Sequence, residues 1–147
     1  MGWHGVILLD TNVLSEFMRP QPTEAVTVWL DRFPPEQLWT CAISRAEIAL
    51  GLALMPKGKR QAALALAAQA MFEEDFAGRC LPFDERMALH YAAIVAQRTH
   101  VGRPISTEDA QIAAIALAHN LTLATRNVSD FEGIDGLQII NPWLIQP

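Results

Sequence analysis

The stretch of sequence that decides the fold is Val6-Ile7-Leu8-Leu9-Asp10-Thr11-Asn12. Its first four residues form a short apolar run, which is typical of a buried strand in a parallel sheet. The next three residues all carry side-chain oxygens and end the run. Because open α/β sheets bind their ligands beyond the carboxyl ends of the strands, the carboxylate of Asp10 is well placed for chemistry.

Apolar segments and helical patterns alternate along the rest of the chain. This alternation predicts an α/β fold with a central, mainly parallel, twisted sheet flanked by helices. The expected strands are 6–9, 38–43, 79–83, 121–125 and 137–140. The expected helices are 12–18, 23–33, 44–55, 57–76, 84–99 and 107–119. No repeat or linker is visible, so we expect a single domain over residues 1–147.

Composition and charge exclude several classes of protein. Of the 147 residues, 51% are hydrophobic and 18% are charged, and the formal net charge is −5. This charge argues against electrostatic binding of duplex DNA over a broad face. The most apolar helix candidate, residues 61–72, is too short to span a bilayer, and no signal peptide is readable, so we expect a cytoplasmic protein. Cys41 and Cys80 lack the spacing of a zinc or redox site and are expected to be buried thiols.

A nucleic-acid enzyme needs only a local basic rim, and several cations are candidates for one. They are Arg19, Arg45, Lys57, Lys59, Arg60, Arg103 and Arg126. Each of them can also be an ordinary surface charge. The histidines show no metal-ligand spacing on a shared helical face and are expected at the surface or at helix ends. They are His4, His90, His100 and His119.

Four carboxylates each lie where an apolar run gives way to a turn or to the start of a helix. They are Asp10, Glu47, Asp109 and Asp130. Their placement predicts one acidic pocket at the edge of the sheet. Convergent carboxylates without His or Cys ligands suit a hard divalent cation such as Mg²⁺ or Mn²⁺, which leaves coordination positions for water and phosphate.

Each of these carboxylates also has a purely structural explanation. Asp10 can cap the helix that follows it, and the other three lie three residues after a Ser or an Asn, as in a capping box. Glu47 opens the uncharged segment Ile48 to Met55, which should be buried nearly all round, and an unpaired buried carboxylate is costly. Asp109 shares a helical face with Ile112, whereas its neighbour Glu108 is rotated toward solvent.

The motifs around these acids resemble those of PIN-domain proteins. Residues 8–16 and 44–52 are similar to the first two motifs of that family, and residues 104–116 and 123–131 are similar to the third and fourth. The resemblance spans residues 6–143 and is strongest to the VapC-type toxins, particularly their FitB-like branch. Many members of the family carry Asp where this chain has Asn127.

The resemblance implies a three-layer PIN-like domain and a metal-dependent endoribonuclease that is the toxin of a type II toxin–antitoxin pair. The four carboxylates would hold Mg²⁺ or Mn²⁺, and a metal-activated water would hydrolyse an RNA phosphodiester. Neighbouring polar groups would fix the carboxylates, although turn and cap chemistry explains them equally well. These groups are Thr11, Asn12, Thr125 and Asn127.

The same resemblance implies a small DNA-binding antitoxin encoded upstream, with DNA bound only through that partner. We expect a toxin homodimer, with each subunit also bound by an antitoxin tail and no contact with a membrane. Two apolar segments are candidates for these interfaces or, equally, for the chain's own core. They are the helix of residues 23–33, with a stripe at Val26, Trp29, Leu30 and Phe33, and the hairpin of residues 50–66.

Two other functions stay open from the sequence. An Asp after the first strand also suits haloacid-dehalogenase-like phosphohydrolases, but these usually carry a second Asp where this chain has Asn12. A non-catalytic PIN-like module could instead use the acidic cleft to bind a basic peptide.

Overall fold

The computed structural model describes residues 5–145 of the chain. Within this range lies a sheet of five parallel strands in the order β3-β2-β1-β4-β5. The strands are β1 (Ile7–Leu9), β2 (Leu38–Cys41), β3 (Cys80–Leu81), β4 (Thr122–Ala124) and β5 (Ile139–Ile140). All three residues of β1 are buried, as expected for a central parallel strand with both faces covered.

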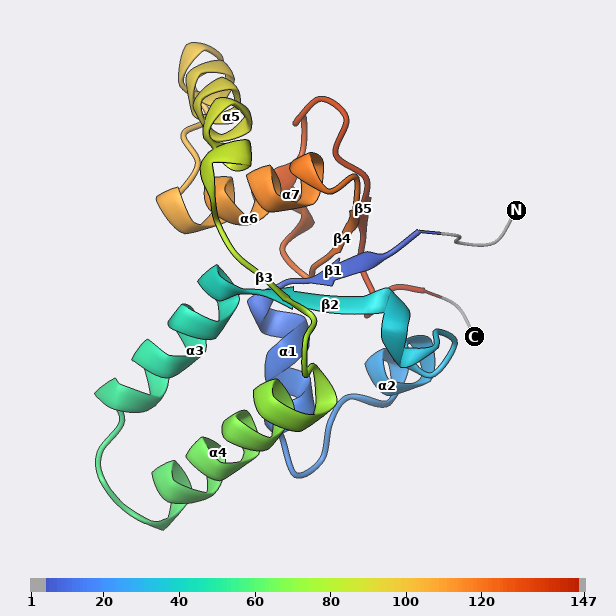
Figure 1. The fold of residues 1–147 in the computed structure, drawn as a ribbon, viewed down its shortest axis with the longest axis vertical. Helices are drawn as coiled ribbons and strands as arrows, with labels where there is room; N and C mark the ends of the chain where they lie inside the picture. The colour runs from blue at the N-terminus through green and yellow to red at the C-terminus, as the bar shows by residue number, and fades with distance from the viewer. Residues whose placement is uncertain (1–4, 146–147) are drawn as a thin grey trace.

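Helices cover both faces of the sheet and make a three-layer α/β architecture (Figure 1). One layer contains α1 (Thr11–Met18), α2 (Glu24–Leu30), α3 (Ala42–Leu54) and α4 (Lys59–Ala70). The opposite layer contains α5 (Ala88–His100), α6 (Thr107–Ala118) and α7 (Val128–Phe131). Short helical turns are η1 (Pro35–Gln37), η2 (Met71–Asp75), which prolongs α4, and η3 (Glu85–Met87), which leads into α5.

Two apolar cores lie on the two faces of the sheet. Ile7 and Leu9 belong to the core under α1, α2 and α4, whereas Leu8 belongs to the core under α6. This division follows from the alternation of side chains along a strand. The α/β prediction and the order of its elements are therefore confirmed, with strands shorter than the apolar runs that predicted them.

The hairpin of α3 and α4 projects away from the sheet (Figure 1). The expectation that residues 48–55 are buried nearly all round is wrong, because Ile48 is the one fully buried residue among them. Leu54 is 76% exposed and Leu66, on α4, is 69% exposed. Only one side of α3 has neighbours to pack against, since the helix lies beyond the end of the sheet. The apolar stripe of α2 behaves differently, because Trp29 and its neighbours are buried in the chain's own core.

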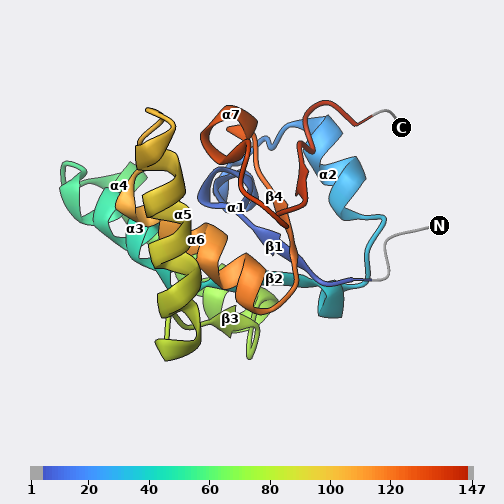
Figure 2. The ribbon, with the colours of Figure 1, turned by 90° about the horizontal axis from the view of Figure 1, so that it is seen from above.

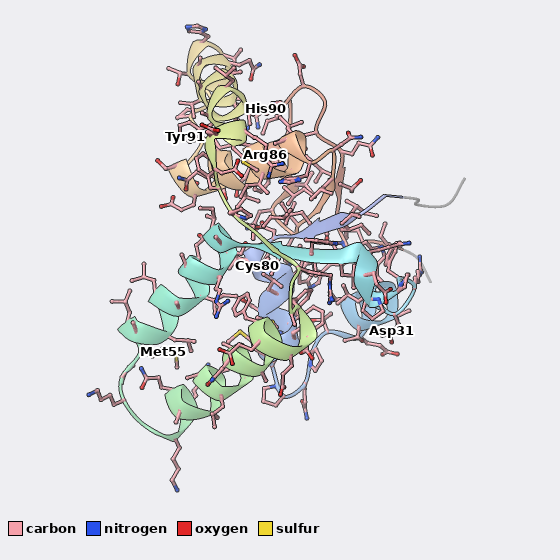
Figure 3. All side chains as sticks on the ribbon, viewed as in Figure 1. Asp31, Met55, Cys80, Arg86, His90 and Tyr91 are labelled. Atoms are coloured by element: carbon pink, nitrogen blue, oxygen red, sulfur yellow. The ribbon has the colours of Figure 1, made fainter. Side chains whose placement is uncertain are left out.

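The two cysteines are both free, and they differ in environment. Cys41 is buried, and burial raises the pKa of its thiol to about 11, so this thiol is not a nucleophile at neutral pH. Cys80 is only partly buried, which corrects the prediction for that residue; it lies on β3, the edge strand (Figure 3). Among residues 5–145, no helix is both long enough and apolar enough to span a membrane.

Candidate active site

The carboxyl ends of β1, β2 and β4 lie at one edge of the sheet, where α1, α3 and α6 begin (Figure 1). Figure 2 shows the fold from above, with α5 crossing over α6 on the near side of the sheet. Asp10 ends β1, Glu47 lies on α3, Asp109 lies in the first turn of α6, and Asp130 lies on α7. Segments that are far apart in the sequence therefore bring all four predicted carboxylates to this edge.

Asp10 is the most buried of the four carboxylates, with 4% of its surface exposed. Its carboxylate accepts hydrogen bonds from the Thr125 hydroxyl at 2.7 Å, the Thr11 backbone N–H at 2.8 Å and the Asn12 amide at 3.1 Å. Burial raises the pKa of Asp10, these three bonds oppose the rise, and the charge of Asp130 adds to it. The capping explanation is correct, since Asp10 is the N-cap of α1. Only one carboxylate oxygen makes the capping bond, and the other accepts the bonds from Thr125 and Asn12.

Thr125 and Asn12 join the segment after β4 to the start of α1. The Thr125 hydroxyl is buried and also accepts bonds from the Asn12 amide at 3.3 Å and from the Asn127 backbone N–H at 3.1 Å. The Asn12 side-chain oxygen accepts the Arg126 backbone N–H at 3.1 Å. Asn127 thus contributes to this network through its backbone, and its side chain makes no capping bond to α7.

Glu47 accepts a hydrogen bond from a hydroxyl group of α1, that of Thr11. The Thr11 hydroxyl donates to the Glu47 carboxylate at 2.7 Å and lies 3.0 Å from the Ser44 oxygen. The predicted capping box between Ser44 and Glu47 is absent, because α3 begins at Ala42 and Ser44 lies inside the helix. Ser44 is instead fully buried beside Thr11.

Asp109 takes part in the N-cap of α6 through its backbone and in the acidic cluster through its carboxylate. Its backbone N–H donates to the Ser106 hydroxyl at 3.1 Å, which confirms the N-cap of α6. Its carboxylate is half-buried, and its pKa is raised to about 6. Burial is the largest cause, and the negative charges of Asp10, Asp130 and Glu47 add to it. A hydrogen bond with Ser106 acts in the opposite direction and lowers the pKa. The four carboxylates are therefore close enough to repel one another. Glu108 is exposed, as predicted.

Asp130 is the exposed member of the cluster. It lies on the single turn of α7, which is anchored in the core by Phe131. The proposed capping pattern from Asn127 is limited to a backbone bond, since the Asp130 N–H donates to the Asn127 carbonyl at 3.1 Å. The Asp130 carboxylate is therefore available to the pocket.

The donor set fits a hard divalent cation. Within the described range, the acidic partners in ion pairs are Glu16, Asp84 and Glu132, so no lysine or arginine neutralises the four clustered carboxylates. A cation would relieve their mutual repulsion. No three His, Cys, Asp or Glu side chains within residues 5–145 surround a metal position as they stand. The Glu47 carboxylate is turned toward the Thr11 hydroxyl, which is one reason why the carboxylates do not surround a metal position.

Histidines are not part of the cluster. His90 and His100 are exposed on α5, and His119 is the C-cap of α6, beside Arg86 at 3.4 Å. Figure 3 shows His90 in the α5–α6 layer, on the far side of the sheet from α3. The remaining histidine, His4, lies outside the described residues.

Several of the predicted rim cations have structural partners. Arg19 pairs with Glu16 at 2.8 Å, and the Arg45 guanidinium lies 5.1 Å from the centre of the Phe72 ring. Lys57, Lys59 and Arg60 are exposed near the tip of the α3–α4 hairpin. Arg126 is exposed, and its backbone N–H donates to the Asn12 side chain, which also bonds to Asp10. Its guanidinium lies 5.0 Å from the centre of the Trp143 ring.

Two residues at the site were missed in the sequence. Ser44 was interpreted only as a cap, although it lies beside Thr11. Arg98 is buried on α5 and bonds to the backbone of the segment that carries Asp130. A signal for Arg98 was present, since it lies four residues after Ile94 on the buried stripe of α5.

The chain belongs to the PIN domain family, whose model matches residues 7–137. It is 44% identical to the toxin FitB of Neisseria gonorrhoeae over 138 residues, which cover 94% of this chain and 99% of that protein. It is also 44% identical to the VapC ribonuclease Y4jK of Sinorhizobium fredii, over 94% of this chain and 98% of the relative. A solved structure of FitAB bound to an IR36 DNA fragment contains a chain that matches with a TM-score of 0.84 and 41% identity, covering 97% of this chain and 99% of that one.

Proposed function

We propose that this chain is a metal-dependent endoribonuclease and the toxin of a type II toxin–antitoxin pair, formed by one domain over residues 1–147. The observation that carries the proposal is the cluster of four carboxylates at the edge of the sheet, which no lysine or arginine of the described residues neutralises. Similarity along 94% of the chain to proteins named as a toxin and a ribonuclease supports the same function.

The four carboxylates have distinct proposed roles. Asp10, Glu47 and Asp109 would hold Mg²⁺ or Mn²⁺ directly or through its waters, and Asp130 would hold a second ion or orient the attacking water. A bound divalent cation lowers the pKa of its water and stabilises the negative charge that builds on the phosphoryl oxygens. The acids supply oxygen donors only, which suits these two metals better than zinc.

The neighbouring polar groups keep the acids in place. The Thr125 hydroxyl and the Asn12 amide hold one Asp10 oxygen, and the other accepts the Thr11 N–H and keeps a lone pair for a cation. The Thr11 hydroxyl, which lies beside the Ser44 hydroxyl, holds one oxygen of Glu47. Asn12 is a neutral amide that donates to Asp10, so it cannot act as the acid that a haloacid-dehalogenase-like phosphohydrolase requires at this position.

Arg126 is the proposed contact for RNA at the rim of the pocket. Its guanidinium is stacked on Trp143, and its backbone bonds to the Asn12 side chain that orients Asp10. An exposed arginine held over an aromatic ring can bind a phosphate or stack on a base. The acidic pocket therefore has a cationic group beside it that compensates for the net negative charge of the chain.

The proposed partner is a small DNA-binding antitoxin encoded upstream, which would also carry the affinity for DNA. An arginine or lysine of its tail would enter the acidic pocket and block the path of the phosphate. A groove of about 470 Å³ leads away from Glu47 between α1, α3 and α4, with Met18, Leu52 and Met55 among its apolar lining residues. The exposed leucines of the α3–α4 hairpin provide further apolar surface for a homodimer within this complex. Since RNA is the substrate, we place the activity in the cytoplasm.

The proposal is tested by two linked experiments. Purified chain is incubated with RNA in EDTA, and Mg²⁺ or Mn²⁺ is then restored; cleavage should appear only with the metal. The chain is also co-expressed with its upstream neighbour, which should co-purify with it and suppress cleavage. Metal binding without any cleavage of cellular RNA would favour the non-catalytic module instead.

A further inference from the structure

Arg98 is a buried arginine on α5, with 4% of its surface exposed. Its guanidinium donates to three backbone carbonyls: Arg103 at 2.7 Å, Asp130 at 3.0 Å and Glu132 at 3.3 Å. Burying a cation is costly unless its donors are satisfied. Here the carbonyls accept from its Nε and Nη1 atoms, and two of the three carbonyls belong to the segment that carries Asp130. The C-terminal part of α5 is thereby bonded to α7.

The segment that carries Asp130 cannot be stable by itself. α7 has four residues, and Asn127 gives it no side-chain cap. A single helical turn is unstable in isolation, because fixing its backbone is not offset by its own hydrogen bonds. Phe131 anchors one side of the turn in the core. The hydrogen bonds from Arg98 to the Asp130 and Glu132 carbonyls restrain the backbone of this segment further.

We infer that Arg98 is a positioning residue that holds Asp130 at the acidic cluster. Arg98 bonds to the carbonyl of Asp130 itself, so a shift of this carbonyl moves the Cα from which the carboxylate extends. Arg103 reinforces the restraint, since it donates to the Ser129 carbonyl at 3.1 Å and lies 4.0 Å from the Glu132 carboxylate. The inference rests on the proposed function, in which Asp130 serves the metal site.

The shape of the guanidinium matters for this role. Its Nη1 atom contacts the carbonyls of Asp130 and Glu132, while Nε contacts the carbonyl of Arg103. A lysine has one ammonium group and cannot reproduce this fork. Arg98→Lys should therefore keep the charge and lose part of the restraint, and Arg98→Met should lose all of it.

Arg79 offers a matched control at the opposite end of the sheet. Its guanidinium also bonds to backbone carbonyls, those of Leu38 and Asp75, and it lies over the Phe76 ring. Arg79→Met therefore removes comparable contacts without touching α7.

The test uses the full chain and measures two quantities for each variant: amide hydrogen exchange in residues 128–132 and Mn²⁺ affinity by calorimetry. In Arg98→Met, exchange in this segment should be at least tenfold faster, and Mn²⁺ affinity should fall about tenfold, at the lower end of the range for residues that orient metal ligands. Arg98→Lys should be intermediate in both and serves as the decisive variant if Arg98→Met does not fold. Arg79→Met should leave both unchanged.

Normal exchange in residues 128–132 of the folded Arg98 variants would overturn the inference. Faster exchange with unchanged Mn²⁺ affinity would overturn it as well, because the metal site would then not depend on the position of Asp130. Asp130→Asn separates this failure from that of the proposed function. If Asp130→Asn and the wild-type chain bind Mn²⁺ equally, Asp130 does not hold a metal ion, and the restraint by Arg98 does not act on the metal site.

Discussion

The raised pKa of Asp109 predicts that metal binding depends steeply on pH. A carboxylate must be ionised to bind a cation. With a pKa of about 6, about a tenth of the Asp109 carboxyl groups are ionised near pH 5 and about nine tenths near pH 7. The Mn²⁺ affinity measured by calorimetry should therefore rise about tenfold between these two pH values. The raised pKa of Asp10 acts in the same direction.

The same pKa shift predicts the sign of a stability effect. The pKa of Asp109 rises from its ordinary value of 3.8 to about 6 on folding, so the folded chain binds the proton more tightly. Its contribution to stability is present below about pH 4 and is lost as the pH rises through about 6. Asp109→Asn should remove this dependence, and at neutral pH the metal-free variant should melt at a higher temperature than the wild-type chain.

Glu108→Gln is the matched control for this prediction, because Glu108 lies in the same helical turn but is exposed. It should keep both the pH dependence and the metal affinity of the wild-type chain. A Mn²⁺ affinity that is equal at pH 5 and pH 7 would refute the proposed coupling of Asp109 to the other carboxylates. So would an Asp109→Asn variant that binds Mn²⁺ as tightly as the wild-type chain.

Three further predictions follow from the network around the carboxylates. Thr125→Val removes the 2.7 Å bond to Asp10 and should lower Mn²⁺ affinity by about 10-fold to 100-fold. Thr122→Val, on the strand that precedes Thr125, should not; equal affinities of the two variants would contradict this prediction. Arg126→Gln should raise the KM for RNA about tenfold, reduce the salt dependence of binding by about one ion and leave kcat unchanged. Arg86→Gln is the control, and an unchanged KM for Arg126→Gln would show that Arg126 does not contact RNA. Millimolar Mg²⁺ or Mn²⁺ should raise the melting temperature by relieving carboxylate repulsion, and an unchanged temperature without calorimetric binding would argue against the pocket.

The sequence was most informative where one local pattern determines one structure. The apolar run before Asp10 predicted a strand that is covered on both faces, as the structure shows. The helix that contains Asp109 is preceded by its N-cap residue, Ser106. Because parallel strands end at a common edge, the convergence of the carboxylates followed from the order of the elements.

The sequence was least informative where burial depends on the packing of distant elements. The uncharged part of α3 was expected to be buried, yet the helix projects beyond the sheet and leaves Leu54 in solvent. Ser44 was read as a cap because the start of α3 was placed two residues too late. The sequence does not single out Arg98 among the arginines, since two of its three carbonyl partners come from a segment that only the tertiary fold brings to it.

The most direct test of the central claim is RNA cleavage by Asp10→Asn in the presence of Mg²⁺ or Mn²⁺. Asparagine keeps the shape and the N-cap of α1 but removes a formal charge from the acidic cluster. The proposed function predicts a folded variant that does not cleave RNA. Asp84→Asn changes another N-cap aspartate, far from the cluster, and should cleave normally. A purified Asp10→Asn variant that cleaves RNA at the wild-type rate would contradict the assignment of Asp10 to the metal site.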